Sequence, residues 1–115
     1  MKRNIFKTIL ISSLVFLTHF AGKASTDTST FKVSGNCEMC KETIEAALDV
    51  NGVKHANWSI ETGLITVVFN PEKISLDKIH QLISKAGYET DKLPANESAY
   101  LELHKCCRYT KKLHK

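Results

Sequence analysis

The chain has 115 residues, and its formal charge of +4 reflects sixteen basic and twelve acidic side chains. Four of the basic residues and none of the acidic ones lie in residues 1–24, so the remainder is close to neutral. A neutral stretch of about 90 residues has room for one modest core. It lacks the basic surface that nucleic-acid binding requires, so that class of function is excluded.

Residues 1–24 have the three parts of an export signal. A basic start at Lys2 and Arg3 precedes an apolar run over 9–17, and Ala24 offers a cleavage point among small residues. The run is shorter than the roughly 20 apolar residues that cross a bilayer. The sequence therefore predicts a signal peptide over 1–24, a periplasmic location, and no membrane anchor after the signal is removed.

Strand and helix patterns alternate after the signal. Small polar residues over 25–30 predict a flexible leader, and the domain is expected to begin at Phe31 with a short strand. A helix should follow and stop at Gly52, because apolar residues recur at helical spacing before it. Its apolar positions are Cys40, Ile44, Ala47 and Leu48.

A hairpin and a second helix come next. Alternating apolar residues predict strands over 53–60 and 64–69. The side chains expected to face the core are Ala56, Trp58, Ile60, Ile65, Val67 and Phe69. Ser75 is expected to cap a helix that ends at Gly87, and a last strand should cover 88–93.

The predicted order over residues 31–93 is strand, helix, strand, strand, helix, strand. This order is that of the ferredoxin-like βαββαβ sandwich, an α+β fold. The sequence thus predicts a four-stranded antiparallel sheet with two helices on one face.

Cys37 and Cys40 stand at the start of the first predicted helix, where both sulfurs can face one point. Unpaired N–H groups and the positive end of the helix dipole favour thiolates there. Two thiolates suit a soft ion of low coordination number, so Cu(I) is favoured, with Hg²⁺ or Zn²⁺ as alternatives. A disulfide would close a very small loop and add little stability, so it explains the spacing poorly.

A resemblance to a known family rests on these residues. The segment FKVSGNCEMC over 31–40, the hairpin, and the closing AGY over 86–88 resemble the heavy-metal-associated domain of copper chaperones, metal-transporting ATPases and periplasmic mercury-binding proteins. The resemblance implies the ferredoxin-like fold and a metal held between Cys37 and Cys40. It also implies transfer by ligand exchange to a partner's similar site, and no enzymatic activity.

Two further residues enter through the resemblance. Family members carry an aromatic residue near the metal, and Tyr88 occupies the matching place. The family's usual loop reads Gly-Met-Thr-Cys, whereas the loop that ends at Cys37 is one residue shorter and lacks the Met that packs beneath the site. Met39 is expected to replace it in part, and the difference bears on which metal is preferred.

Residues 94–115 form a C-terminal tail outside the usual domain. Asn96 is expected to cap a short helix there. The residues expected on one side of that helix are Tyr100, Leu103 and Cys107. The adjacent thiols of Cys106 and Cys107 leave three interpretations open: a strained disulfide, free thiols, or metal ligands together with His104. The tail is long enough to reach the first cysteine pair, so its sulfurs are candidates for completing or covering that site.

The sequence predicts a small exported metallochaperone or metal scavenger, a monomer or a metal-bridged dimer, that serves a metal-transporting membrane protein or efflux system. Two alternatives remain. A thiol–disulfide redox protein also uses a Cys-x-x-Cys pair, although the strand order is not that of thioredoxin. The other alternative is an accessory module whose metal-bound tail changes shape to act on a partner.

Overall fold

The computed structural model describes residues 25–114, and the predicted signal peptide over 1–24 lies outside the described residues. The elements in chain order are β1 (Asp27–Lys32), α1 (Glu38–Ala47), β2 (Val53–Trp58), β3 (Leu64–Phe69), α2 (Leu76–Lys85), α3 (Glu97–Glu102) and a 3-10 turn, η1 (Lys105–Cys107). Within this part of the chain, no helix has the length and apolar character needed to cross a membrane.

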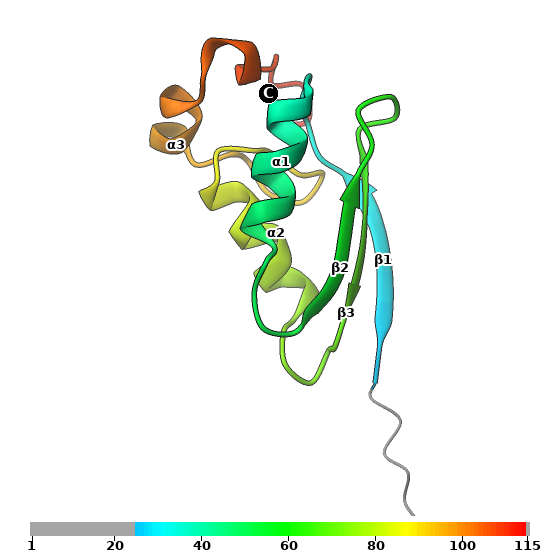
Figure 1. Ribbon diagram of the computed structural model, residues 1–115. Coiled ribbons are helices and arrows are strands. Elements are labelled where there is room, and N and C mark those ends of the chain that lie inside the picture. The colour runs from blue at the N-terminus through cyan, green and yellow to red at the C-terminus, as the bar shows by residue number, and fades with distance from the viewer. Residues whose placement is uncertain (1–24, 115) are drawn as a thin grey trace, which may run out of the picture.

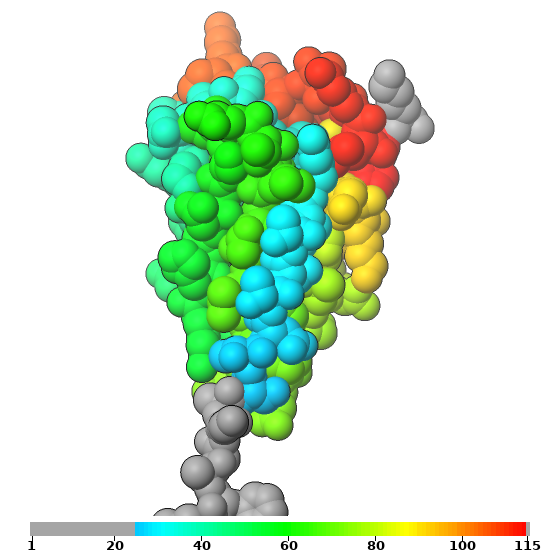
Figure 2. All heavy atoms as spheres, turned by 90° about the vertical axis from the view of Figure 1, so that its right-hand side faces the viewer, coloured from blue at the N-terminus to red at the C-terminus, as the bar shows by residue number. Residues whose placement is uncertain are grey.

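The three strands form one antiparallel sheet in the order β1-β3-β2, so β3 lies at its centre. Ile65 of β3 lies opposite Phe31 on one side and Trp58 on the other. Helices α1 and α2 cover one face of this sheet (Figure 1). The other face carries no helix of the described residues (Figure 2). The predicted α+β class is confirmed, with the core between one sheet face and two helices.

The core lies along the apolar sides of both helices. Cys40 and Ile44 of α1 and Ile79 and Ile83 of α2 are fully buried against the sheet. The hydroxyl of Ser75 accepts a hydrogen bond from the N–H of Lys78 at 3.1 Å, as the predicted N-cap requires. Amphipathic spacing and a cap residue therefore place both helices correctly.

Two expectations at the strand ends are wrong. Residues 27–30, predicted as part of a flexible leader, belong to β1 and pair with β3, so the strand begins at Asp27 and not at Phe31. Ile60 was expected in the core but is 39% exposed. β2 ends at Trp58, and the chain then turns, because the carbonyl of Ser59 accepts from the N–H of Gly63 at 2.8 Å.

The predicted fourth strand over 88–93 is not formed among the described residues. A single bridge, between Val33 and Thr90, continues the sheet at that edge. The hydroxyl of Thr90 accepts from the N–H groups two and three residues later, at 3.1 and 3.0 Å, which turns the chain away. The N–H of Glu89 donates to the hydroxyl of Tyr109 at 2.9 Å. Over residues 25–114 the sheet therefore has three strands, and the tail takes one hydrogen bond that a strand would have made.

A histidine lies inside the core beside this bridge. His80 on α2 is 3% exposed and stacks on the ring of Phe31, with centroids 4.0 Å apart. Its Nδ1 lies 2.6 Å from the hydroxyl of Thr90. Burial lowers the pKa of His80, and the nearby carboxylate of Asp91 opposes this effect only in part.

We expect the lowered pKa of His80 to make the fold less stable in weak acid. The unfolded chain takes up a proton near the ordinary His pKa of about 6.5, and the folded chain does not. Stability should therefore be complete above about pH 6.5 and should fall as the pH decreases below it. Urea unfolding of wild type and His80→Gln between about pH 5 and 7 measures this slope. Equal slopes for the two proteins would contradict the assignment to His80.

Candidate metal centre

The two cysteines of the Cys-x-x-Cys pair lie at the start of α1. Cys37 is its N-cap residue in extended conformation, and Cys40 lies in its first turn. Their sulfurs are 3.3 Å apart, too far for a disulfide, and all four cysteines of the chain are free thiols. The Cys40 thiol donates to the amide oxygen of Asn36 at 3.1 Å. The loop and the helix thus bring both sulfurs to one point, as predicted.

The loop that carries Cys37 rests on a core tryptophan. The indole N–H of Trp58 donates to the carbonyl of Val33 at 3.0 Å. The far edge of the same ring lies directly beneath Gly35. Trp58 is 1% exposed, so the loop lies on a rigid support. This contact fixes the path of the chain from β1 into Cys37.

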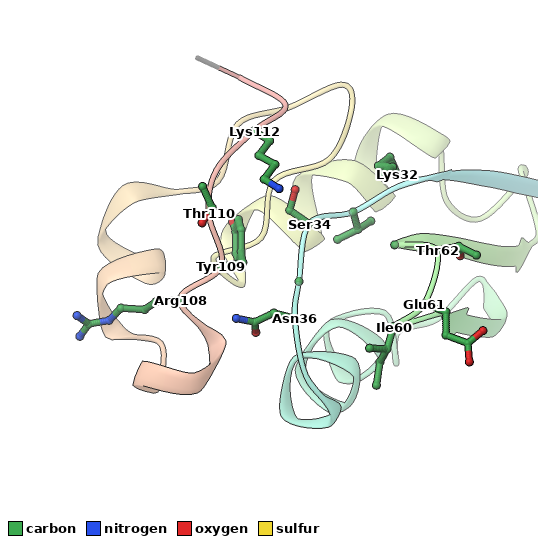
Figure 3. A pocket seen from close by; sticks show the side chains of 13 residues that line it. Lys32, Ser34, Asn36, Ile60, Glu61, Thr62, Arg108, Tyr109, Thr110 and Lys112 are labelled. Carbon is green, nitrogen blue, oxygen red and sulfur yellow. The ribbon is translucent and has the colours of Figure 1, made fainter.

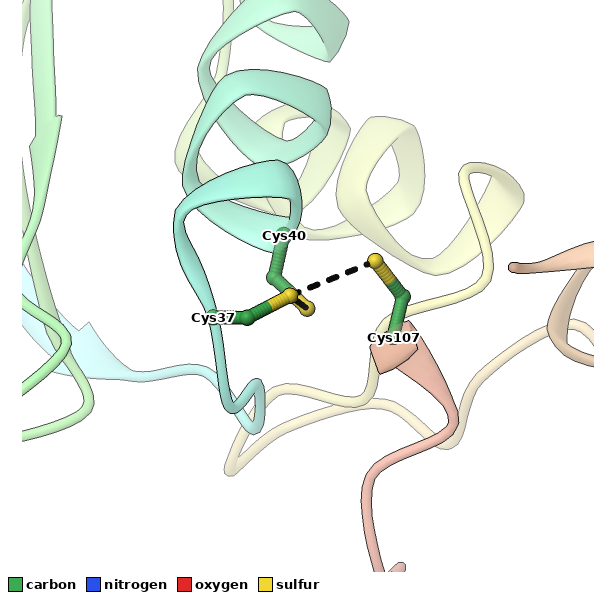
Figure 4. A group of neighbouring side chains, drawn as sticks. All are labelled: Cys37, Cys40 and Cys107. Carbon is green, nitrogen blue, oxygen red and sulfur yellow. Dashed lines mark hydrogen bonds between the residues drawn. The ribbon is translucent and has the colours of Figure 1, made fainter. Parts of the chain in front are cut away.

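A third sulfur joins the pair from the far end of the chain. The sulfur of Cys107 in η1 lies 3.5 Å from that of Cys37 (Figure 4). The sulfurs of Cys37, Cys40 and Cys107 all lie within 4.8 Å of one another. We call these three residues the sulfur group. Cys40 and Cys107 are buried, and Cys37 is half-buried.

The other predicted site residues lie outside the sulfur group. Cys106 is exposed, with its sulfur 3.8 Å from that of Cys107 and 3.9 Å from the thioether of Met39. Met39 is itself 42% exposed, so the expectation that it packs beneath the site is wrong. His104 is exposed and is not part of the group. Met39 lies on the exposed side of the first turn of α1, next to the exposed Glu38, whereas Cys40 faces the core.

The tail is attached to the domain by buried tyrosine contacts. Tyr109 is 3% exposed, and its hydroxyl donates to the carbonyl of Gly87 at 2.8 Å and accepts from the N–H of Glu89 at 2.9 Å. The hydroxyl of Tyr100 on α3 donates to the carbonyl of Tyr109 at 2.7 Å. The predicted cap of α3 is confirmed, since the side chain of Asn96 accepts from the third residue of the helix.

Glu89 holds the residues that follow Tyr109. Its carboxylate accepts from the hydroxyl of Ser34 at 2.7 Å and from the N–H groups of Lys112 and Leu113 at 2.8 and 3.2 Å. These hydrogen bonds lower the pKa of Glu89, although its burial acts in the opposite direction. The reasoning from sequence missed both Glu89 and Tyr109, because neither has a chemical motif around it. A buried Glu that pairs with backbone N–H groups is visible only in three dimensions.

Tyr88 lies next to the sulfur of Cys40. It is fully buried and stacks on Tyr109 with ring centroids 5.6 Å apart. Burial, followed by the neighbouring Cys40 sulfur, raises the pKa of Tyr88 far above its usual range. Its hydroxyl has no hydrogen-bond partner among the described residues. The hydroxyl therefore stays protonated beside the sulfurs.

The sulfurs differ in their readiness to ionise. Burial alone would raise the pKa of Cys37, but the backbone N–H of Cys40 and then the neighbouring thiols lower it overall. Burial raises the pKa of Cys107, and the hydrogen bonds that it shares with Cys40 and Cys37 add to this effect. Without metal, Cys37 is therefore the easier thiolate to form and Cys107 stays a thiol. A soft cation would displace the remaining protons, since thiolate is the form that binds metal.

A groove of about 510 Å³ runs beside the site, between the tail and the loop that precedes Cys37 (Figure 3). The side chains on its rim include Ser34, Asn36, Glu61, Arg108, Thr110 and Lys112. Two of these are cations of the tail. A surface that approaches the sulfur group from this side meets positive charge.

Comparison with known proteins identifies the family. Residues 30–89 match the heavy-metal-associated domain. The mercuric transport protein periplasmic component of Shewanella putrefaciens is 36% identical over 71% of this chain and 92% of its own length. The copper chaperone CopZ of Staphylococcus saprophyticus is 34% identical over 54% of this chain and 94% of its own.

Solved structures agree with this result. The Cu(I)-loaded N-terminal domain of a potential copper-translocating P-type ATPase from Bacillus subtilis matches with a TM-score of 0.54 and 28% identity. The match covers 56% of this chain and 84% of that domain. Cys37 and Cys40 lie within the matched family segment, and Cys107 lies beyond it. This chain belongs to the heavy-metal-associated domain family.

Proposed function

We propose that the protein is an exported carrier of a soft metal ion. Cys37 and Cys40 hold the ion as thiolates and pass it by ligand exchange to a metal-transporting membrane protein or efflux system. Cu(I) is the favoured cargo, with Hg²⁺ or Zn²⁺ as alternatives. The carrier catalyses no bond-making reaction and works in the periplasm as a monomer or as a metal-bridged dimer.

The observation that carries this proposal is the sulfur pair, 3.3 Å apart at the N-terminus of α1 in a fold of this family. Soft sulfur ligands select Cu(I) and related ions over hard cations such as Mg²⁺. Cys37 is half-buried, so a partner's thiolate can reach a metal bound there. Its lowered pKa favours the thiolate form that binds metal. The relatives named for periplasmic mercury transport, copper chaperoning and copper translocation support the same class of cargo and partner.

The test is a competition titration of the purified, reduced protein with Cu(I), Hg²⁺ and Zn²⁺ against a chromophoric chelator. We expect tight binding of one Cu(I) per chain, and its loss in the double variant Cys37→Ser/Cys40→Ser. The variant Cys106→Ser is the matched control, because it removes an exposed thiol outside the sulfur group. A preference for Hg²⁺ or Zn²⁺ would change the cargo.

Failure of the wild-type protein to bind any of the three ions would overturn the proposal. The lowered pKa of Cys37 favours thiol–disulfide exchange as the second candidate in that case. Turnover of a disulfide substrate that depends on Cys37 would then establish the redox function.

A further inference from the structure

We propose that the C-terminal tail is part of the metal centre, and that Cys107 is a third thiolate ligand that completes a trigonal three-sulfur site. This inference rests on the proposed function, because it takes Cys37 and Cys40 to be metal ligands. It assigns the tail a role that lies outside the matched family segment, which ends at residue 89.

The spacing of the sulfurs fits three-coordinate geometry. A planar site with metal–sulfur bonds of about 2.3 Å separates its sulfurs by about 4.0 Å. The sulfur of Cys37 lies 3.3 Å from that of Cys40 and 3.5 Å from that of Cys107. All three lie within 4.8 Å of one another. A side-chain adjustment of under about 1 Å would therefore seat a metal among the three sulfurs.

The tail is positioned without help from a metal. Tyr109, two residues after Cys107, is buried and bonded to the backbone on both sides of Tyr88. Farther along, the carboxylate of Glu89 accepts from two backbone N–H groups of the tail. Ahead of Cys107, α3 packs its Tyr100 edge-on against Tyr109, with ring centroids 5.1 Å apart. The third sulfur is thus held in place before binding, so little ordering entropy opposes its use.

Only one of the two adjacent tail thiols is suitably placed. Cys107 is 2% exposed, with its sulfur 3.5 Å from that of Cys37, whereas Cys106 is exposed and its sulfur contacts Met39 and the sulfur of Cys107. Cys106 therefore provides a matched control, with the same chemistry one residue away.

A third sulfur changes what the carrier can do. It covers the ion from the side that the two-cysteine loop leaves open, and its thiol proton passes to solvent when the metal binds. Release then requires exchange to begin at the half-buried Cys37 or the tail to leave its place. The arrangement favours retention of the metal until a specific partner engages it.

The experiment compares wild type, Cys107→Ser and Cys106→Ser, each reduced and loaded with one equivalent of Cu(I). X-ray absorption at the copper edge should give three sulfur neighbours in wild type and Cys106→Ser, and two in Cys107→Ser. Competition with a chelator should show that Cys107→Ser lowers the Cu(I) affinity at least about tenfold and that Cys106→Ser does not. Tenfold is the smallest loss usually seen when a residue that only supports a metal ligand is removed, so loss of a ligand should cost at least as much. Circular dichroism of the metal-free proteins checks that the variants fold, and Cys107→Ala provides a second variant without a polar atom.

The outcomes separate this inference from the proposed function. Two sulfur neighbours in wild type, with affinity unchanged in Cys107→Ser and Cys107→Ala, would overturn the three-sulfur site and leave the two-cysteine carrier intact. An equal loss in Cys106→Ser would also count against it, since the effect would not be specific to the buried thiol. Failure of wild type to bind Cu(I), Hg²⁺ or Zn²⁺ would overturn both.

Discussion

Replacing Trp58 by alanine is expected to lower the free energy of unfolding by about 3–5 kcal/mol, the usual cost of emptying a large aromatic site in a core. Trp58 is 1% exposed, and its indole N–H satisfies the carbonyl of Val33. Its removal leaves a cavity beneath the loop that leads to Cys37. Since small domains are stable by roughly 5–15 kcal/mol, the variant should be close to the limit of folding. Urea denaturation of the metal-free protein measures the loss.

The variant Trp58→Phe separates packing from hydrogen bonding. It keeps an aromatic ring and loses the N–H, so the carbonyl of Val33 is left unpaired at a cost of about 1–3 kcal/mol. We expect the free energy of unfolding of Trp58→Phe to lie between those of wild type and Trp58→Ala. A loss below about 1 kcal/mol for Trp58→Ala would show that the loop does not depend on this support.

Replacing Gly87 by alanine is expected to detach the tail. Gly87 has a φ of 98°, which costs a residue with a Cβ about 1–2 kcal/mol. The added Cβ would also lie 2.9 Å from the backbone of Ala99 in α3, which has no flexible end to move aside. Alkylation of thiols in the native protein, followed by peptide mapping, reports the change. Cys107 should become reactive, while Cys40 stays protected in the core.

Gly63→Ala is the matched control for this effect. Gly63 also has a positive φ, of 72°, but a Cβ there meets first the end of the Lys32 side chain at 3.4 Å. Gly63→Ala should therefore lose only the stability that a positive φ costs a residue with a Cβ. We expect Gly87→Ala to lose at least about 1 kcal/mol more than Gly63→Ala, the lower range of overpacking costs. Equal stabilities and a protected Cys107 in both variants would show that α3 shifts without releasing the tail.

Local patterns in the sequence were enough to locate the cysteine pair and both main helices. The two cysteines of the Cys-x-x-Cys pair lie within one turn of the start of α1, and Ser75 caps the helix that follows it. Neither feature depends on distant residues. The strand over 88–93 failed as a prediction for the opposite reason. Its loss depends in part on a distant residue, since the N–H of Glu89 bonds to Tyr109, 20 residues away, in place of a strand neighbour.

The position of the third sulfur also depends on a contact that local sequence patterns do not reveal. The sequence offered both Cys106 and Cys107 as metal ligands, because adjacent residues have the same reach, although the expected helix placed only Cys107 on the side of Tyr100 and Leu103. Which one points inward is decided by Tyr109, whose burial anchors the chain just after η1. A tyrosine in a basic run gives no sign of that role. The exposure of Met39 was likewise not visible, since the helical phase of one residue depends on where the first turn begins.

The distance along the chain between the sulfurs determines whether cargo and folding are coupled. Cys37 and Cys40 are three residues apart, so an unfolded chain can still bind a metal with both of them. Because the ion then binds the folded and the unfolded chain, it stabilises the native state little. Cys107 is 70 residues from Cys37, and only the folded chain brings it near. An ion shared by all three sulfurs ties the last part of the chain to the first, and it acts as a removable cross-link. The loaded carrier would then resist unfolding and proteolysis, and delivery of the metal would return the protein to its more easily degraded form.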